Sequence, residues 1–352
     1  MKIVYIDTNT LGHHISYISA LSGISDNEVV AILPENVEKL NCKQYEYVTQ
    51  DRKNGKRSFS QYIKWINEIH SFVEKENPDV VHILNGDFFY RYFGLGLRKF
   101  RKYKTVITFH CLRDGFLNKL SVKSIASIVN AVVLHSEYLK NRLSDYGRNN
   151  GVHIEYPNFR QNNCSTDKAK EYFNLNPDIP VLGCIGETRH DKGLDILLNA
   201  LEFVTEPFQL LVAGRPVHFD EQFISDNTKK YSKNVHCLLK FLSDEEFQYA
   251  LNATDIITIP YRKEFNAASG PLGEGANLEK CIVGPCHGNL GDTIEKNHLG
   301  YTFLSEDVKS LAETLNKALK TDFKPDEIYK EYKNSLDVKS FLESYENLYK
   351  TL

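Results

Sequence analysis

Three basic side chains, Arg189, His190 and Lys192, stand between an apolar run and a helical pattern. Residues 181–185 have the length and composition of a buried strand, and apolar residues recur at helical spacing over 194–201. The first turn of a helix offers unpaired N–H groups and the positive end of the helix dipole, so it favours an anion, and neighbouring cations strengthen that preference. The stretch therefore predicts a phosphate site. The alternative is a solvated basic turn after a strand.

A second loop, residues 260–274, could bind a phosphate through backbone N–H groups instead of charged side chains. Small residues at Ser269 and Gly270 leave N–H groups open to a phosphate, and Pro271 is well tolerated at a helix start. Glu274 is expected in the first turn of the helix that follows, where its carboxylate can accept hydrogen bonds from two ribose hydroxyls. The alternative is a glutamate that only complements the helix dipole.

The elements that must position these loops alternate in type along the whole chain. Its 352 residues exceed what one hydrophobic core usually supports, so two domains are expected. Strand patterns occupy residues 2–7, 28–33, 79–84, 105–109, 131–135, 152–156, 181–185, 208–214, 235–239, 256–261, 281–285 and 301–304. Helical patterns lie between them, among them an amphipathic helix over 61–76 and an aromatic one over 88–100. This alternation predicts an α/β protein of two Rossmann-like, doubly wound parallel sheets.

In such sheets ligands bind beyond the carboxyl ends of the strands. Four polar groups follow strands in this way, and we expect them to face a cleft between the two domains: Gly12–His13–His14, His110, the Arg189–Lys192 turn and the 260–274 loop. His110 directly follows the strand pattern VITF and is favoured as functional. His82 and His135 are interpreted as packed or hydrogen-bonded residues.

Composition excludes several classes of protein. The chain is 41% hydrophobic and 25% charged with a net charge of −3, which is typical of a soluble globular protein and argues against a nucleic-acid binder. The seven cysteines are scattered without a C-x-x-C pair, so neither a disulfide framework nor a zinc ribbon is expected. No run is long and apolar enough for a membrane span, and a signal-peptide pattern is missing from the N-terminus. A cytoplasmic protein with reduced thiols is expected.

Five segments together resemble a known family. They are GETRHDKGLDILLNA, LKFLSDEEFQYALNATDIITIPYR, ASGPLGEGANLEKCIVGPCHGNLGDTI, TFHCLRD and HSEYLKNRL. In combination they are similar to the motifs of retaining GT-B glycosyltransferases of the large fourth family, the glycosyl transferases group 1 type. The resemblance implies a GT-B fold with an acceptor-binding domain over residues 1–160 and a nucleotide-sugar-binding domain over 161–335. It also implies that a final helix, within 336–352, crosses back to the first domain.

The resemblance assigns roles to matching residues. Arg189 and Lys192 would hold the donor diphosphate and neutralise it as it leaves, and Glu274 would bind the ribose. His110 would be catalytic, next to the donor sugar. The remaining implied contacts are Gly12, Gly270, Pro271 and Leu272 with the diphosphate, Phe241 with the base, Asn266 and Ser269 with the donor sugar, and His13 or His14 with the acceptor.

Two positions depart from the family pattern. The first of the family's paired glutamates would fall at Asn266, because Glu264 is out of register. The arginine that usually follows the glycine is Glu187, so Arg189 has to supply that charge. The identity of the transferred sugar is therefore left open.

The expected activity is that of a hexosyltransferase. It would move a sugar from a UDP- or GDP-linked donor to a glycan, glycolipid or other acceptor in bacterial surface polysaccharide synthesis. The sequence contains no Asp-x-Asp pair, so cations and helix dipoles would offset the charge of the leaving group, and no metal or other cofactor is expected.

Alternatives remain open at this point. A catalytically degenerate GT-B subunit that binds a glycan or partner protein is the main one, and an epimerase or phosphorylase has no support in the sequence. Peripheral contact of the N-terminal domain with an anionic membrane is a further hypothesis, against a solvated helix end. It depends on aromatic residues within 88–93 and on two basic clusters, Arg98, Lys99, Arg101, Lys102 and Lys104, and Arg52, Lys53, Lys56 and Arg57.

Overall fold

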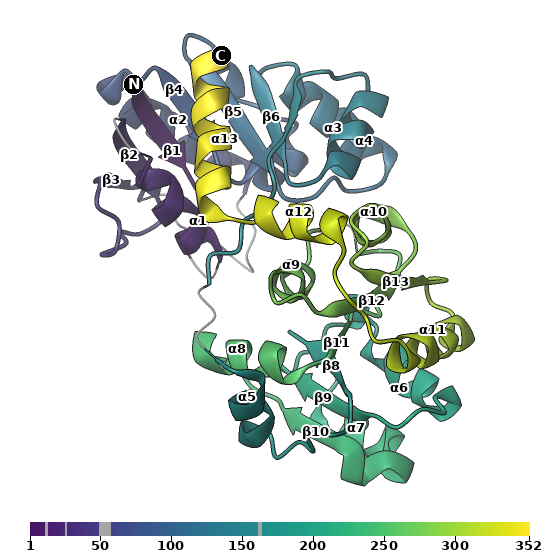
Figure 1. Cartoon of the computed structure of the whole chain (residues 1–352). Helices are drawn as coiled ribbons and strands as arrows, with labels where there is room; N and C mark the ends of the chain where they lie inside the picture. The colour runs from purple at the N-terminus through teal and green to yellow at the C-terminus, as the bar shows by residue number, and fades with distance from the viewer. Residues whose placement is uncertain (11–12, 25–26, 49–57, 161–163, 266) are drawn as a thin grey trace. The chain divides into compact units, whose positions relative to one another are not determined.

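The computed structural model of the chain describes residues 1–10, 13–24, 27–48, 58–160, 164–265 and 267–352 (Figure 1). The chain forms two compact units. The first unit comprises Met1–Phe159 together with Val338–Leu352, and the second unit comprises Arg160–Asp337. Each unit has its own parallel sheet and its own hydrophobic core on both sheet faces. The prediction of two Rossmann-like α/β domains is confirmed.

The sheet of the first unit is entirely parallel, with strand order β3-β2-β1-β4-β5-β6-β7. Its strands are β1 (Lys2–Ile6), β2 (Glu28–Leu33), β3 (Lys43–Glu46), β4 (Val80–Ile83), β5 (Lys104–Phe109), β6 (Ala131–Leu134) and β7 (Gly151–His153). β3 was not predicted, because its sequence KQYE has no apolar run and it lies at the edge of the sheet. The order of the strands reverses between β1 and β4, which is where a doubly wound sheet offers a ligand site.

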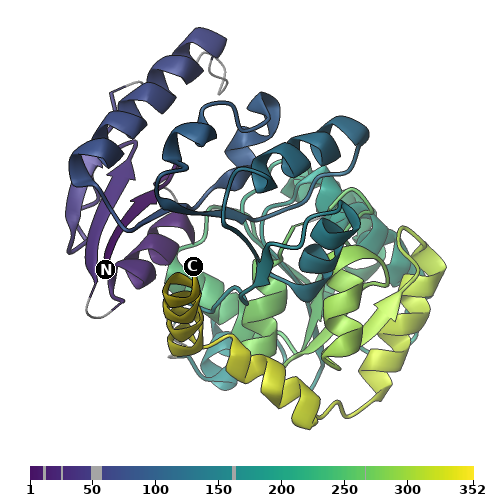
Figure 2. The same cartoon turned by 90° about the horizontal axis from the view of Figure 1, so that it is seen from above.

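Helices cover both faces of this sheet. They are α1 (His13–Ser22), α2 (Phe59–Glu76), α3 (Phe116–Ala126), α4 (Glu137–Asp145) and α13 (Val338–Thr351). Successive β1 residues alternate between the two cores: Val4 packs with Trp65 of α2, and Tyr5 packs with Tyr345 of α13. Figure 2 shows α13, in yellow, on one side of the purple-to-blue strands and α2 on the other. The C-terminal helix is therefore part of the first unit's core.

The aromatic helix predicted over 88–100 is wrong. The segment forms two short 3₁₀ helices, η1 (Gly86–Tyr92) and η2 (Leu97–Phe100). Gly94 and Gly96 between them have φ values of 69° and 89°, which an α-helix cannot accommodate. Phe89 and Tyr90 are buried in the core, whereas Phe93 is 41% exposed, so the membrane hypothesis stays a prediction. Within the described residues, no helix is both long and apolar enough to cross a bilayer.

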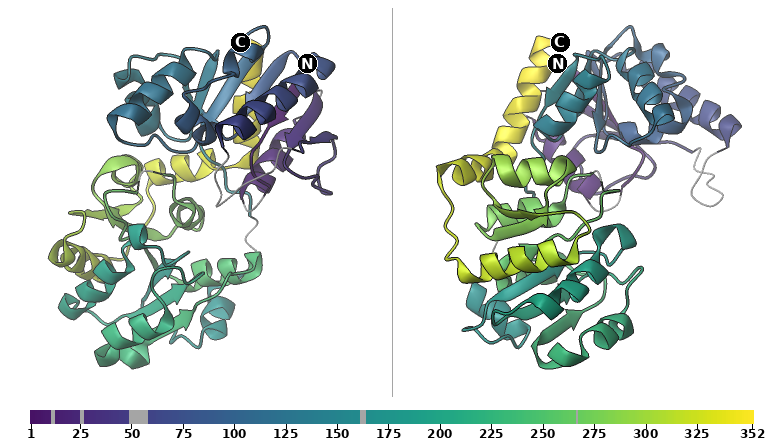
Figure 3. Two further views of the ribbon diagram at one scale, coloured as in Figure 1. Left: turned by 180° about the vertical axis from the view of Figure 1, so that it is seen from behind. Right: turned by 90° about the vertical axis from the view of Figure 1, so that its right-hand side faces the viewer.

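The second unit has a six-stranded parallel sheet with order β10-β9-β8-β11-β12-β13. Its strands are β8 (Val181–Ile185), β9 (Gln209–Ala213), β10 (Val235–Leu238), β11 (Ile256–Thr258), β12 (Cys281–Pro285) and β13 (Gly300–Phe303). Its helices are α5 (Thr166–Tyr172), α6 (Leu194–Ala200), α7 (Glu221–Asn227), α8 (Asp244–Ala253), α9 (Gly270–Asn277), α10 (Gly288–Lys296), α11 (Val308–Lys320) and α12 (Glu327–Ser335). Figure 3 shows these strands lying between the helices. The order reverses between β8 and β11, so the loops that follow these two strands lie next to each other.

Candidate functional site

The loop after β8 is held tightly against the end of β11. It turns at Gly186, with φ of 122°, forms the short 3₁₀ helix η3 (His190–Lys192) and enters α6 at Gly193, with φ of 62°. A Cβ atom on Gly193 would lie 2.1 Å from the carbonyl oxygen of Pro260, so only glycine fits this approach. The backbone N–H of Arg262 also donates to the carbonyl of Asp191 at 2.9 Å. The two loops at the switch point therefore form one structure.

Lys192 lies at the centre of this structure. Its Nζ is 5.2 Å from the centroid of the buried Tyr261 ring. A Cβ atom on Gly186 would be 2.8 Å from Nζ and 4.0 Å from Cγ of Pro271, so the ammonium group lies beside the start of α9. Ser269, the residue before α9, donates from Oγ to the Tyr261 hydroxyl at 3.4 Å. Three predicted residues, Lys192, Ser269 and Pro271, are thus brought together around Tyr261.

The start of α9 offers backbone groups, as predicted for a phosphate site. Apart from its chain neighbours and the backbone of its own helix, no described residue lies within 4 Å of the position that a Cβ atom on Gly270 would take. The side chain of Leu272 is buried in the core, so only its backbone can face a ligand. Glu274 is the fifth residue of α9, and the expectation that it would lie in the first turn is wrong. The helix begins one residue after Ser269, earlier than the sequence suggested.

Arg189 is near Lys192 in the sequence but is paired with carboxylates in the structure. Its Nε and Nη2 donate to the two carboxylate oxygens of Asp191 at 2.9 and 2.8 Å, and Nη1 is 3.6 Å from Glu187. Glu187 is also paired with Arg215, two residues after β9. The hydrogen bond from Arg189 lowers the pKa of the Asp191 carboxyl. A diphosphate would have to compete with these carboxylates for Arg189.

Glu274 is buried and holds an arginine that the sequence did not suggest. Its Oε1 accepts a hydrogen bond from Nη1 of Arg160 at 3.0 Å. Nε of Arg160 donates to Asp244, the first residue of α8, at 2.9 Å, and the guanidinium lies 4.7 Å from the Phe247 ring centroid. Phe241, the predicted base contact, precedes α8 and is 78% exposed. Phe241 therefore lies just before α8, and Glu274 is linked to the start of α8 through Arg160.

In the first unit, His110 follows β5 as predicted and is tied to the ends of two other elements. Its backbone N–H donates to Oδ2 of Asp87 at 2.8 Å, and its Nε2 donates to the carbonyl of Leu84 at 2.9 Å. Burial, with a smaller contribution from His14, lowers the pKa of His110, although Asp87 acts in the opposite direction. The ring is therefore neutral at pH 7, and Nδ1 is its acceptor nitrogen.

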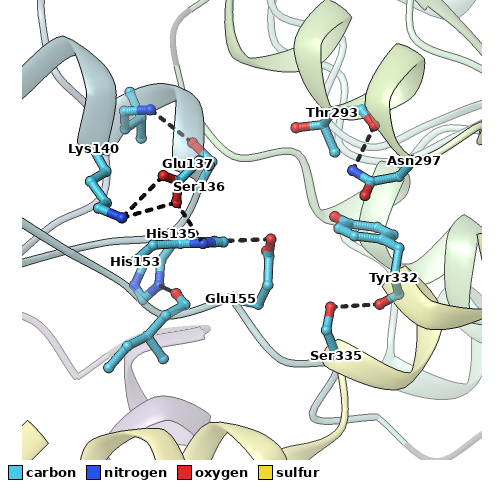
Figure 4. Close-up of polar contacts among 12 residues, drawn as sticks. His135, Ser136, Glu137, Lys140, His153, Glu155, Thr293, Asn297, Tyr332 and Ser335 are labelled. Atoms are coloured by element: carbon cyan, nitrogen blue, oxygen red, sulfur yellow. Dashed lines mark hydrogen bonds and ion pairs between the residues drawn. The ribbon is translucent and has the colours of Figure 1, made fainter. Parts of the chain in front are cut away.

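Two further histidines adjoin His110. The His14 ring centroid lies 5.9 Å away, and its Nδ1 is 3.0 Å from Oδ2 of the buried Asp7, which directly follows β1. The His135 ring lies 5.3 Å away, and its Nδ1 donates to the carbonyl of Ile154 at 2.8 Å. Burial lowers the pKa of His135 well below its usual value. Figure 4 shows His135 near His153, whose ring nitrogens adjoin carboxylates. His135 is thus a packed, hydrogen-bonded residue, as interpreted from the sequence.

Potential metal ligands do not gather at either set of loops in the part of the chain that the structure describes. Within those residues, no group of three or more His, Cys, Asp or Glu side chains is arranged to hold a metal ion. The side chains that bring positive charge to the switch-point loops of the second unit include Lys192 and Arg189.

Comparison with known proteins finds that part of the second unit is similar to a known family. Residues 179–321 match the family described as Glycosyl transferases group 1. This matched stretch lies within the second unit, which is therefore similar to that family. A glycogen synthase from Cellvibrio japonicus is 29% identical over 157 residues, which are 41% of this chain and 31% of that enzyme. The chain thus spans less than a third of the length of this curated relative.

Solved structures with a similar fold superpose on the whole length of the chain. Anabaena HepE in complex with UDP and glucose superposes with a TM-score of 0.76 at 14% identity, covering 100% of both chains. The apo form of the lipopolysaccharide outer core galactosyltransferase WaaB gives a TM-score of 0.73 at 14% identity, again covering 100% of both. At this identity the likeness shows the fold, which is GT-B.

Not every predicted site residue can be placed. Gly12 and Asn266 lie outside the described residues, as does the basic cluster within 52–57, and the side chain of His13 is likewise not described. Their roles stay predictions.

Four residues at the sites were missed from the sequence. Asp7 and Tyr261 each follow a strand, and this position could have singled them out. Asp87 and Arg160 carry no local signal, because they act on loops far away in the chain: Arg160 and Glu274 are separated by 114 positions.

Proposed function

We propose that this chain is a retaining glycosyltransferase that moves a hexose from a nucleoside-diphosphate sugar to a saccharide or lipid-linked acceptor. One observation carries the proposal: the Lys192 ammonium lies beside Gly186 and Pro271, at the open start of α9. A cation next to backbone N–H groups at a helix N-terminus fits a diphosphate. The complex of HepE with UDP and glucose, a chain of the same fold, supports this choice of donor.

The remaining donor contacts follow the same chemistry. Glu274 accepts hydrogen bonds from the ribose hydroxyls, and the backbone of Ser269 to Leu272 faces the distal phosphate or the sugar. Arg189 exchanges Asp191 for phosphate oxygens, since both are anions that match its fork of N–H donors. A UDP- or GDP-linked donor fits this set, because none of these contacts reads the base.

The reaction needs no nucleophilic side chain. The bond from the anomeric carbon to the diphosphate breaks, and the acceptor oxygen bonds to the same carbon on the same face. The acceptor proton passes to the leaving diphosphate, whose charge Lys192 and Arg189 offset. His110 is neutral and presents Nδ1 as an acceptor, which suits a hydrogen bond from a donor-sugar hydroxyl.

We further propose that turnover requires no divalent metal. The support is that Lys192 and Arg189 supply positive charge at the place where the leaving group develops negative charge. Sugar transfer in excess EDTA should equal transfer in added Mg²⁺ or Mn²⁺, and loss of activity on chelation would contradict the proposal.

The acceptor is proposed to belong to a bacterial surface polysaccharide or glycolipid. The support is the likeness in fold to the lipopolysaccharide outer core galactosyltransferase. Assays with lipid-linked and free oligosaccharide acceptors would separate these two classes of acceptor.

The proposed function is tested by calorimetric titration of UDP and GDP. We expect one of them to bind, and Lys192→Ala to weaken binding by about 10- to 100-fold, because a hydrogen bond to a charged group is worth roughly 1.5–3 kcal/mol. Lys229→Ala is the matched control, since Lys229 is an exposed lysine of the same unit paired with Asp226, and it should change nothing. If neither nucleotide binds the wild type, the degenerate-subunit alternative replaces the transferase.

A further inference from the structure

Arg160 is a charged residue to which the proposed transfer reaction gives no role. Its guanidinium is fixed from three sides: Nη1 donates to Glu274 at 3.0 Å, Nε donates to Asp244 at 2.9 Å, and the plane lies 4.7 Å from the Phe247 ring centroid. Asp244 and Phe247 belong to α8, and Glu274 belongs to α9. A single side chain therefore connects the start of α8 with the middle of α9.

The pairing matters because of where Glu274 lies. Its side chain is only 9% exposed, whereas that of Arg160 is 41% exposed. A carboxylate removed from water is costly to keep charged unless a cation and hydrogen bonds compensate it. Arg160 supplies both, and it approaches from the more exposed side. Glu274 can therefore remain an ionised, acceptor-only group.

An ionised Glu274 can serve Arg160 and a ligand together. A carboxylate offers about four acceptor positions, so it can accept from Nη1 of Arg160 and from ligand hydroxyls at the same time. Two vicinal hydroxyls can donate to such a group, as the transferase proposal requires of a ribose. Because Asp244 and Phe247 fix the guanidinium, the bond to Oε1 also fixes the direction of the Glu274 carboxylate.

We propose that Arg160 is a positioning residue for ribose recognition, acting through Glu274. This inference rests on the proposed function and extends it to specificity: Arg160 sets how strongly the site prefers a ribonucleotide over a deoxyribonucleotide. Arg160 is also the first residue of the second unit, so the ribose carboxylate is held by the segment on which the chain enters that unit.

The test compares a nucleotide with its 2′-deoxy form. UDP or GDP, whichever the wild type binds more tightly, is titrated alongside its 2′-deoxy counterpart into the full chain. The wild type should prefer the ribonucleotide about tenfold, the value of a hydrogen bond to a charged group. In Arg160→Gln the preference should fall to about twofold or less, mainly through weaker ribonucleotide binding. Glu274→Gln should lose the preference equally, and the double variant should lose no more, because the two residues act as one unit.

Arg142→Gln is the matched control. Arg142 is an arginine of the first unit that pairs with Asp114 and lies near the ring of Tyr146, and its loss should leave the preference unchanged. Arg160→Lys, which keeps the charge without the planar fork, should restore part of the preference.

Two results would overturn the inference alone. If Arg160→Gln binds both nucleotides more weakly by the same factor, Arg160 only supports the fold. If it binds both more tightly, Arg160 competes with the ligand. If the wild type binds neither UDP nor GDP, the proposed function fails, and this inference fails with it.

Discussion

At the scale of single residues, some glycines of the second unit are required by close packing, whereas others, such as Gly270, are not. Gly193 approaches Pro260 so closely that a side chain cannot fit, and a Cβ atom on Gly186 would meet the Lys192 ammonium. Gly270 has open space around it at the start of α9. Packing does not require a glycine at position 270, and Lys192 lies beside this helix start. The open space at Gly270 therefore fits a ligand.

We therefore expect Gly270→Ala to separate stability from binding. Alanine is the better helix former, so the free energy of unfolding should stay the same or rise by up to about 1 kcal/mol. The added methyl group occupies the space proposed for the phosphate or sugar, so the affinity for a nucleotide sugar should fall about tenfold, roughly 1.4 kcal/mol. Calorimetry and urea denaturation measure the two effects.

Gly147→Ala is the control for this pair of measurements. Among the residues that the structure describes, none lies within 4 Å of the position of a Cβ atom on Gly147 either, but its φ is 76° and it lies in the first unit. This change should cost about 1 kcal/mol of stability and leave nucleotide binding intact. Unchanged binding in Gly270→Ala would contradict the proposed position of the donor.

At the scale of elements, α13 is attached to the first unit by buried polar contacts as well as by packing. The Tyr349 hydroxyl is 2.6 Å from Nδ1 of His82 in β4, and Thr108 of β5 is 2.8 Å from its Nε2. Tyr345 also contacts Tyr17 of α1. Burial lowers the pKa of His82 to about 3. The last helix and two central strands therefore share a histidine that is neutral in the folded chain.

This histidine predicts acid sensitivity. The pKa of His82 is lower in the folded than in the unfolded chain, so between pH 6.5 and 3 the unfolded chain binds the proton and stability falls as the pH falls. From pH 7 to 4.5 the loss should be about 2–3 kcal/mol. His82→Gln should flatten this part of the pH profile in urea denaturation, whatever it does to stability at pH 7. Parallel profiles for the two proteins would show that His82 does not titrate in this way.

At the scale of the whole molecule, the two units have separate cores, and Lys192, Arg189 and Glu274, the side chains proposed to bind the nucleotide, lie in the second unit. Chains of this kind often unfold in more than one step. The single tryptophan, Trp65, is buried in the core of the first unit, so its fluorescence reports that unit alone. Circular dichroism reports both units.

We expect the nucleotide to stabilise one unit only. At about 100 times its dissociation constant, UDP or GDP should stabilise the second unit by about 2.7 kcal/mol. In urea denaturation the part of the dichroism signal from the second unit should shift to higher urea, while the midpoint of Trp65 fluorescence stays where it was. A joint shift of both signals would mean that the two units unfold together.

The sequence by itself determined the architecture. Alternating apolar strands and amphipathic helices require parallel sheets with helices on both faces, and the loops after β5, β8 and β11 then follow as the places for polar chemistry. These features are local. The spacing of apolar residues in a segment, and the identity of the residue that follows a strand, can be read from a short stretch of sequence. Lys192, Ser269 and Pro271 were predicted in this way.

Only the tertiary structure decided which charges meet. That Arg160 holds Glu274 and that Asp87 holds the loop of His110 depends on segments far apart in the chain. The edge strand β3 is paired despite its polar sequence, because its hydrogen bonds to β2 do not require apolar side chains. Such contacts form only when the sheets bring distant segments together, so no local pattern encodes them.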